Sequence, residues 1–436
     1  MRHRPLLIAD GRLIDPASGV DGLRDILIED GKVSAVGRGL SKRLRNRVDL
    51  ERFDAAGLWV IPGLIDLHVH LREPGRTEDE TILTGARAAA RGGVTTVLAM
   101  PNTKPAVDSP ALVRLVRRAA KGAAVNVLTA GAVTKGQAGR ALADLERLAA
   151  AGAAAFSDDG FPVADAGLMR RALERAKRLG LPVLDHAEDL GLTGKGVLGL
   201  SAAKRLNVAG IPPDSEVMMA ARDIALARLT GGPLHLCHVS TAGTVALLRE
   251  AKRLGIAVTA EAAPHHFTLT EAQVPDGPRA ADWKMKPPLR GAADRAAVRQ
   301  ALAEGVIDCV ATDHAPHAPG KKAKGVCGAP FGVIGLETSL PLSLELWRVG
   351  LLSRLALVER LALAPARILG LKTKGRLLRG ADADVAVVDP AARWTPRPPY
   401  ASKSRNTPFA GRPLCGRAVL TLVGGRTAFR LKEHAS

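Results

Sequence analysis

The stretch WVIPGLIDLHVHLREPG (residues 59–75) contains an apolar run that ends in two histidines, His68 and His70, with Arg72 two positions later. On a β-strand, residues i and i+2 face the same side, so the two imidazoles could bind one ion together. The pair alone does not separate a metal site from two histidines on a polar strand. The rest of the chain has to decide between them.

Seven more apolar runs follow this one at intervals along the chain. They are residues 93–100, 124–133, 153–160, 181–188, 234–240, 256–266 and 306–314. Between them lie stretches with apolar residues at helical spacing that often end in glycine, such as AGLMRRALERAKRLG (166–180) and TAGTVALLREAKRLG (241–255). Eight strands that alternate with helices predict an α/β fold, a (β/α)₈ TIM-type barrel.

The two ends of the chain have a different sequence pattern, in which short stretches of alternating apolar residues lie between Gly and Asp turns. Because both ends share this character, we expect them to pair into one small β-sandwich domain. The predicted division is 1–58 and 373–436 for this satellite domain and 59–372 for the catalytic barrel. Residues 393–408, RWTPRPPYASKSRNTP, read as a low-complexity linker.

Composition excludes some classes of protein. The chain has 436 residues with 47% hydrophobic content, no apolar run long enough for a membrane span, and no recognisable signal peptide. Its four cysteines form no CxxC pattern, which favours reduced thiols and a cytoplasmic location.

The net charge of +19 raises the question of a nucleic-acid partner. The basic residues are scattered along helices, and the single Tyr and seven Phe offer no basic–aromatic surface, so we expect no nucleic-acid partner and no membrane partner. A solvated Arg-rich surface is the simpler interpretation, and an anionic small substrate would also fit.

Side chains that can bind metals fall at the ends of the predicted barrel strands, where the active sites of such barrels lie. They are His68 and His70, Asp158 and Asp159, His186, His238, and Asp313. Taken singly, each has an ordinary structural explanation: a hydrogen-bonded core histidine, a turn or a helix cap. Together they favour a site for Zn²⁺ or a similar ion.

Four histidines and two aspartates from five strands can hold two ions with one carboxylate between them. A hydroxide between ions about 3.5–4 Å apart is a nucleophile at neutral pH, and the ions polarise the carbonyl that it attacks. A further aspartate on one ion can carry the proton from that water to a leaving nitrogen.

Several motifs taken together resemble one family. They are DLHVHLREPG (66–75), AMPNTKP (99–105), AFSDDG (155–160), CHVST (237–241), TAEAAPHHF (259–267), PPLR (287–290), ATDHAPH (311–317) and APFGVIGLET (329–338). This set resembles bacterial dihydroorotases of the long, type I class in the amidohydrolase superfamily. The resemblance covers nearly the whole chain.

The resemblance implies reversible cyclisation of N-carbamoyl-L-aspartate to L-dihydroorotate in de novo pyrimidine synthesis. It also implies two zinc ions bridged by Asp159 and a hydroxide. His68, His70 and Asp313 would bind the first ion, and His186 and His238 the second. Asp313 would also be the catalytic general acid/base.

The resemblance further implies the substrate contacts. Arg72 and Asn102 would hold the substrate carboxylate, because a guanidinium can bind a planar carboxylate through two parallel hydrogen bonds. His70, His317, Phe331 and Gly332 would line the same site. KKAKGVCGAPFG (321–332) resembles a mobile lid, with an ordinary solvated loop as the alternative.

One position departs from the family. Lys286, in KMKPPLR, stands where the family commonly has Asn. An ammonium can only donate hydrogen bonds, whereas an amide donates and accepts, so Lys286 either points away from the substrate or contacts it differently.

Two alternatives remain. A hydantoinase-, dihydropyrimidinase- or allantoinase-like enzyme would not need Arg72 and Asn102, and those relatives usually bridge their metals with a carboxylated lysine. An inactive partner of aspartate transcarbamoylase would be expected to lose metal ligands, and this chain keeps all six. Family resemblance also implies a homo-oligomer, a dimer, and association with aspartate transcarbamoylase.

Overall fold

The computed structural model describes residues 4–432. In this part of the chain, eight parallel strands form a sheet in the order β15-β14-β13-β10-β9-β8-β7-β6. These strands are β6 (Leu64–Val69), β7 (Val94–Ala99), β8 (Asn126–Ala132), β9 (Ala155–Ser157), β10 (Val183–Asp185), β13 (Leu234–Leu236), β14 (Val258–Ala262) and β15 (Cys309–Val310). A parallel bridge between Val69 and His314 joins the first strand to the segment after the last. The predicted (β/α)₈ barrel is therefore confirmed.

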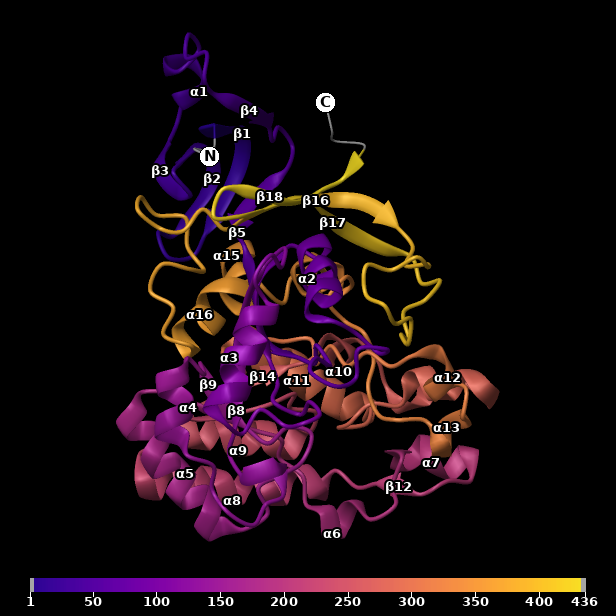
Figure 1. The fold of residues 1–436 in the computed structure, drawn as a ribbon. Helices are drawn as coiled ribbons and strands as arrows, with labels where there is room; N and C mark the ends of the chain where they lie inside the picture. The colour runs from indigo at the N-terminus through magenta and orange to yellow at the C-terminus, as the bar shows by residue number, and fades with distance from the viewer. Residues whose placement is uncertain (1–3, 433–436) are drawn as a thin grey trace.

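Helices lie between successive strands and after the last one (Figure 1). They are α2 (Ile82–Arg91), α3 (Pro110–Ala119), α4 (Leu145–Ala151), α5 (Ala166–Leu179), α8 (Asp214–Thr230), α9 (Ala242–Arg253), α11 (Ala292–Glu304) and α14 (Ser339–Arg348). Helix α5 shows why they form. Its start is capped by the Asp165 side chain, its apolar stripe from Leu168 to Ala176 is buried, and it ends at Gly180 in the left-handed conformation.

Strands from both chain ends form a second sheet, seen at the top of Figure 1. It contains β1 (Leu6–Asp15), β2 (Val20–Glu29), β3 (Lys32–Gly37), β4 (Glu51–Asp54), β5 (Trp59–Pro62), β16 (Val385–Trp394), β17 (Leu414–Val423) and β18 (Arg426–Arg430). One hydrophobic core, with Ile8, Phe53, Val387 and Leu422 among its members, joins residues from both ends.

The run at 59–70 that reads as one strand is divided between the two sheets. Strand β5 pairs with β1 and β16 in the second sheet, which is called the end sheet below because both chain ends form it. Strand β6 begins the barrel after Gly63. A side chain at Gly63 would collide with Thr95, because an added Cβ would lie 2.2 Å from the Thr95 hydroxyl oxygen. The chain therefore passes from one sheet to the other where only glycine fits.

Shorter elements complete the fold. They are α1 (Leu40–Arg43), α6 (Leu190–Thr193), β11 (Leu198–Gly199), α7 (Leu200–Leu206), β12 (Gly210–Ile211), α10 (Pro264–Thr268), α12 (Pro319–Lys322), α13 (Gly325–Gly328), α15 (Arg354–Val358), the π-helical turn Glu359–Leu363 and α16 (Ala364–Ile368), with 3₁₀ turns at Lys135–Gln137, Glu271–Gln273 and Gly277–Trp283.

The interpretation of residues 393–408 as a linker is wrong for its second half. Ser402, Ser404, Asn406 and Thr407 are all buried. This part of the chain returns to the barrel, where its polar groups find partners in the loops that follow the strands.

Candidate metal centre and substrate pocket

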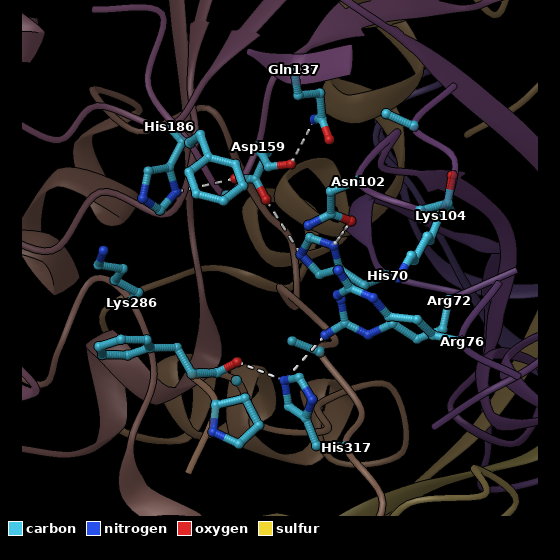
Figure 2. Close-up of a pocket in the computed structure, with 18 of the residues that line it drawn as sticks. His70, Arg72, Arg76, Asn102, Lys104, Gln137, Asp159, His186, Lys286 and His317 are labelled. Carbon is cyan, nitrogen blue, oxygen red and sulfur yellow. Dashed lines mark hydrogen bonds and ion pairs between the residues drawn. The ribbon is translucent and has the colours of Figure 1, made fainter. Parts of the chain in front are cut away.

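All six side chains predicted to bind metal are buried at the carboxyl ends of barrel strands, and Figure 2 shows His70, Asp159 and His186 among them. His68 lies in β6 and His70 just after it. Asp159, His186, His238 and Asp313 each follow a different strand, β9, β10, β13 and β15. The barrel therefore brings together residues that are up to 245 positions apart, because the carboxyl ends of parallel strands meet at one face.

One half of the cluster gathers around Asp159 Oδ2. The Nε2 atoms of His68 and His70 lie 3.2 and 3.4 Å from this oxygen. Asp313 Oδ1 lies 3.0 Å from His70 Nε2 and 3.6 Å from His68 Nε2. Two imidazoles and two carboxylates thus face one point.

The other half gathers around the second oxygen of the same carboxylate. His186 Nδ1 and His238 Nε2 lie 3.2 and 3.3 Å from Asp159 Oδ1 and 2.9 Å from each other. Asp159 therefore belongs to two groups whose ligand atoms are all within metal-binding distance of one another, one with His68 and His70 and one with His186 and His238.

Hydrogen bonds outside the cluster show that it fits metal ions. His68 Nδ1 donates to Glu261 Oε1 at 2.7 Å, and His70 Nδ1 donates to Asn102 Oδ1 at 2.8 Å. In a neutral ring each bond leaves the lone pair on Nε2 facing carboxylate oxygens: His68 Nε2 is buried without a hydrogen-bond partner, and His70 Nε2 lies 3.0 Å from Asp313 Oδ1. Lone pairs that face one another in a dry interior repel unless a proton or a metal ion lies between them.

The pKa shifts of Asp159 and His68 also indicate which charge the cluster favours. Burial alone would raise the pKa of Asp159, but the charge of His68 and the hydrogen bonds of His186 and His238 hold it well below its usual range. Burial alone would lower the pKa of His68, but Asp159 and Glu261 raise it well above its usual value. The cluster therefore favours positive charge at its centre, which a divalent cation supplies.

Two carboxylates outside the predicted ligand set orient these histidines. Glu261 accepts hydrogen bonds from His68 and, through Oε2 at 3.2 Å, from His235. Glu188 Oε2 lies 3.2 Å from His186 Nε2. Sequence analysis missed both residues. A glutamate inside the apolar run at 256–266 was the available signal, because a buried charge requires a partner.

A pocket of about 590 Å³ opens beside the cluster. Arg72 lines it, is 5% exposed, and forms no ion pair with any carboxylate among residues 4–432. Its Nε donates to the Pro316 carbonyl at 3.1 Å, and burial lowers its pKa to about 10. A buried guanidinium without a carboxylate partner is a strong binding site for an anion that enters the pocket.

The other predicted substrate contacts line the same pocket, as Figure 2 shows for Asn102 and His317. His317 donates from Nε2 to the Phe331 carbonyl at 2.7 Å, and burial together with the charges of Arg72 and Lys322 lowers its pKa to about 2, so the ring is neutral. Gly332 has φ +133°, and an added Cβ would lie 2.5 Å from Ala315 Cβ, so this position requires glycine.

Lys286 also lines the pocket, but its ammonium is already paired. Its Nζ lies 3.0 Å from Glu188 Oε2 and 5.1 Å from the centre of the Phe331 ring. Burial alone would raise the pKa of Glu188, but His186 and Lys286 lower it to about 2. Figure 2 places Lys286 across the pocket from Arg72.

The predicted lid segment, residues 321–332, is pinned by two lysines. Lys322 Nζ donates to the carbonyl oxygens of Ala281, Lys284 and Pro330, and Lys284 Nζ donates to those of Cys327 and Ala329. Mobility of this segment stays a prediction, and any opening must break these bonds.

Comparison with known proteins separates the two enzyme classes considered above. A family profile described as "Dihydro-orotase-like" matches residues 57–244. A dihydroorotase of Anaeromyxobacter dehalogenans is 52% identical over 97% of both chains. The chain belongs to the dihydroorotase family. A dihydroorotase of Pelobacter propionicus is 47% identical over 98% of this chain and 99% of its own.

Solved structures of similar fold include members of the alternative class. The L-hydantoinase (dihydropyrimidinase) of Arthrobacter aurescens has a TM-score of 0.86, with 26% identity over 99% of this chain and 96% of its own. The dihydropyrimidinase of Brevibacillus agri has a TM-score of 0.84 at 26% identity over 98% of this chain and 95% of its own. The barrel fold thus also occurs in enzymes outside the dihydroorotase family. The much higher sequence identity to dihydroorotases decides between the two enzyme classes.

Two further findings bear on the sequence predictions. All four cysteines, Cys237, Cys309, Cys327 and Cys415, are free thiols, so no disulfide joins them. Within residues 4–432, no helix combines the length and apolar character needed to cross a bilayer.

Proposed function

We propose that this chain is a zinc-dependent dihydroorotase that interconverts N-carbamoyl-L-aspartate and L-dihydroorotate in pyrimidine synthesis. The observation that carries the proposal is the placement of Asp159, which offers one carboxylate oxygen to each of two histidine pairs. Family membership supports the reaction, because the relatives that are 45–52% identical over nearly the whole chain are named dihydroorotase.

The proposed ligand sets follow the two halves of the cluster. His68, His70 and Asp313 would hold one zinc ion, His186 and His238 would hold the other, and Asp159 would bridge them. When bound, two such ions lower the pKa of a water between them and polarise an amide carbonyl of the substrate. Glu261 and Asn102 keep His68 and His70 in the tautomer that leaves Nε2 free for an ion.

Asp313 moves the proton in this proposal. Burial alone would raise the pKa of Asp313, but its hydrogen bond with His70 and the nearby histidine charges lower it, so the carboxylate is ionised at neutral pH. In ring opening it accepts the proton of the attacking water and delivers it to the ring nitrogen as the C–N bond breaks. In ring closure it removes a proton from the ureido nitrogen, and the same path runs backwards.

Arg72 and Asn102 would select the substrate. The buried Arg72 guanidinium would bind the carboxylate at ring carbon 6, and the free amide nitrogen of Asn102 would donate to the same group. His70, His317, Phe331 and Gly332 would complete the walls of the pocket around the ring. Lys286 was predicted as a substrate contact, but its ion pair with Glu188 gives it a different partner.

One pair of substrates tests the proposal sharply, because dihydrouracil is dihydroorotate without the carboxylate. We would measure turnover of both, and of allantoin, by the zinc-loaded chain, together with zinc content per chain. Turnover of dihydroorotate at least 10²-fold faster than dihydrouracil, with close to two zinc ions, is expected. Preference for dihydrouracil or allantoin would assign a hydantoinase- or allantoinase-like activity, and a chain that binds no zinc would refute the metal centre.

The sequence predicts a barrel (59–372) and a satellite domain (1–58 and 373–436); because β5 (Trp59–Pro62) pairs with β1 and β16, we propose that the barrel begins at Gly63. We also propose a cytoplasmic location, a homodimer, and association with aspartate transcarbamoylase. Family resemblance supports the last two. Light scattering of the purified chain, alone and mixed with its own organism's aspartate transcarbamoylase, tests both. A monomeric mass that does not change in the mixture would refute them.

A further inference from the structure

Lys286 is the one predicted pocket residue that departs from the family pattern, and its surroundings explain what it contacts. Its side chain is 21% exposed, and its Nζ lies 3.0 Å from Glu188 Oε2. The same Nζ lies 5.1 Å from the centre of the Phe331 ring. The ammonium therefore lies on the His186 side of the pocket, away from Arg72 (Figure 2).

Glu188 connects Lys286 to the candidate metal centre. It is 4% exposed, and both of its carboxylate oxygens are in use. Oε1 accepts a hydrogen bond from the Thr193 hydroxyl at 2.8 Å, while Oε2 faces both Lys286 and His186 Nε2. Without the ammonium, Glu188 would be a nearly buried carboxylate with only Thr193 and His186 as donors, which is a costly arrangement.

The orientation of His186 depends on that carboxylate. Its Nδ1 points at Asp159 and at His238 Nε2, so Nδ1 is the atom that can bind a metal. Nδ1 has a free lone pair only when the proton lies on Nε2, and that proton is held by Glu188. A carboxylate that holds the far nitrogen of a histidine ligand fixes its ring orientation and raises its basicity.

We propose that Lys286 is a positioning residue for one half of the metal centre, acting through Glu188 on His186. The inference rests on the proposed dinuclear function. Lys286 balances the charge of Glu188 and holds it against His186 Nε2, so that Nδ1 stays aimed at the ion. Asparagine is shorter and uncharged, and it cannot form this ion pair.

Zinc release from the holoenzyme tests the proposal. The variant Lys286→Met keeps most of the apolar stem and removes the charge. We expect one of its two zinc ions to pass to a chromophoric chelator about tenfold faster than in the wild type, with the other unchanged. Lys286→Arg should restore slow release, whereas Lys286→Asn should behave like Lys286→Met. Lys104→Met, the same change in a pocket lysine next to Arg72, is the matched control for zinc release.

A double-mutant cycle shows whether Lys286 acts through Glu188. Glu188→Gln should also speed release of one zinc ion, and adding Lys286→Met to it should change release no further, because the intermediate group is already neutral. In steady-state kinetics, Lys286→Met should lower kcat for dihydroorotate while KM stays within about twofold. That split distinguishes positioning from direct contact with substrate.

The outcomes separate this inference from the proposed function. A wild type that holds two zinc ions and turns over dihydroorotate, with unchanged zinc release in Lys286→Met, overturns the positioning role alone. A raised KM with unchanged release makes Lys286 a substrate contact instead. A wild type that binds no zinc overturns the dinuclear centre and this inference with it.

Discussion

Asp313 differs from Asp159, the other candidate carboxylate ligand, because it contacts histidines of one half of the cluster only. Its Oδ1 faces His70 and His68, while Asp159 faces all four histidines. Asp313 is buried, and its Oδ1 lies within hydrogen-bond distance of His70 Nε2, which fixes the direction of the carboxylate. A fixed carboxylate at the edge of a metal centre is well placed to exchange a proton with substrate.

We therefore expect Asp313→Ala to abolish turnover, with kcat reduced at least 10³-fold, while the fold stays intact. Asp313→Asn is the matched variant, because it keeps the shape but cannot accept the proton. Circular dichroism, zinc content and kcat would be measured together. Near-normal kcat in either variant would remove Asp313 from the proton path.

Arg72 acts at the same scale through the geometry of one guanidinium. We expect Arg72→Ala to lower kcat/KM for dihydroorotate by about 10²–10³-fold, because a bidentate charged contact is lost, and to leave the slow turnover of dihydrouracil unchanged. Arg72→Lys keeps the charge but lacks the planar guanidinium, so its kcat/KM for dihydroorotate should lie between those of the wild type and Arg72→Ala. Equal losses of kcat/KM for dihydroorotate and dihydrouracil would contradict the proposal that Arg72 binds the substrate carboxylate.

At the scale of elements, the pocket depends on loops that are held by a distant segment. Asn406, which follows β16, is buried, and its side chain accepts from the His317 backbone N–H at 3.1 Å and donates to the carbonyls of Ala315 and Gly332 at 3.0 and 2.9 Å. Its own carbonyl accepts from Ile334 N at 2.8 Å. One side chain thus joins the two loops that carry His317 and Gly332.

We expect Asn406→Ala to cost about 2–4 kcal/mol of unfolding free energy, because three buried backbone groups lose their partner. It should also raise KM for dihydroorotate about tenfold or more while zinc content stays the same. Asn406→Asp keeps the acceptor for His317 N and loses the bonds to the Ala315 and Gly332 carbonyls, so its effect separates the acceptor bond from the two donor bonds. Hydrogen exchange at residues 315–317 and 332–334 provides the structural readout. Unchanged hydrogen exchange at these residues would refute the proposal that Asn406 holds the two loops together.

At the scale of the whole molecule, Asp384 at the base of β16 joins the end sheet to the barrel. Its Oδ2 accepts from Lys374 Nζ at 2.6 Å and from Asn126 Nδ2 of barrel strand β8 at 3.0 Å. Its Oδ1 accepts from Gly424 N at 2.7 Å, and its carbonyl accepts from Gly63 N at 2.8 Å. Lys374 also pairs with Asp382 at 3.0 Å.

The ion pairs of Lys374 with Asp384 and Asp382 make the free energy of unfolding depend on pH. Burial alone would lower the pKa of Lys374, but Asp384 and Asp382 raise it above 10.5. Its contribution is therefore fully present below pH 10.5 and is lost as the pH rises through the folded-state pKa. Burial alone would raise the pKa of Asp382, but Lys32 and Lys374 lower it below 3.8, so that contribution is lost as the pH falls through the lowered value.

We expect Lys374→Met to lower the free energy of unfolding by about 2–3 kcal/mol at pH 7, because it leaves the buried Asp384 without its cation. The difference from the wild type should shrink as the pH rises above 10.5. Lys32→Met, which removes a half-exposed partner of Asp382, is the control and should cost less than about 1 kcal/mol. Denaturant unfolding at both pH values checks this, and a constant difference would contradict it.

Local patterns in the sequence were sufficient for the barrel and for the strand ends that carry the candidate ligands, whereas the choice of Asp159 over Asp158 came from the family resemblance. Strand and helix periods are properties of neighbouring residues, and the ends of parallel strands meet at one face, so His68, Asp159 and His238 could be placed together from their positions alone. The same logic failed at residues 59–70, where one apolar run serves two sheets. It also failed in the second half of the predicted linker 393–408, where Ser402, Ser404, Asn406 and Thr407 are buried.

What only the tertiary structure decided is which groups hold the ligands and loops in place. Glu261 bonds to His68 across 193 positions, and Asn406 reaches the loops at His317 and Gly332 from the far end of the chain. The direction of Lys286, toward Glu188 rather than the substrate, is likewise invisible in the sequence. Hydrogen bonds and ion pairs act over about 3 Å and have no sequence period, so only the folded chain determines which distant groups come within that range.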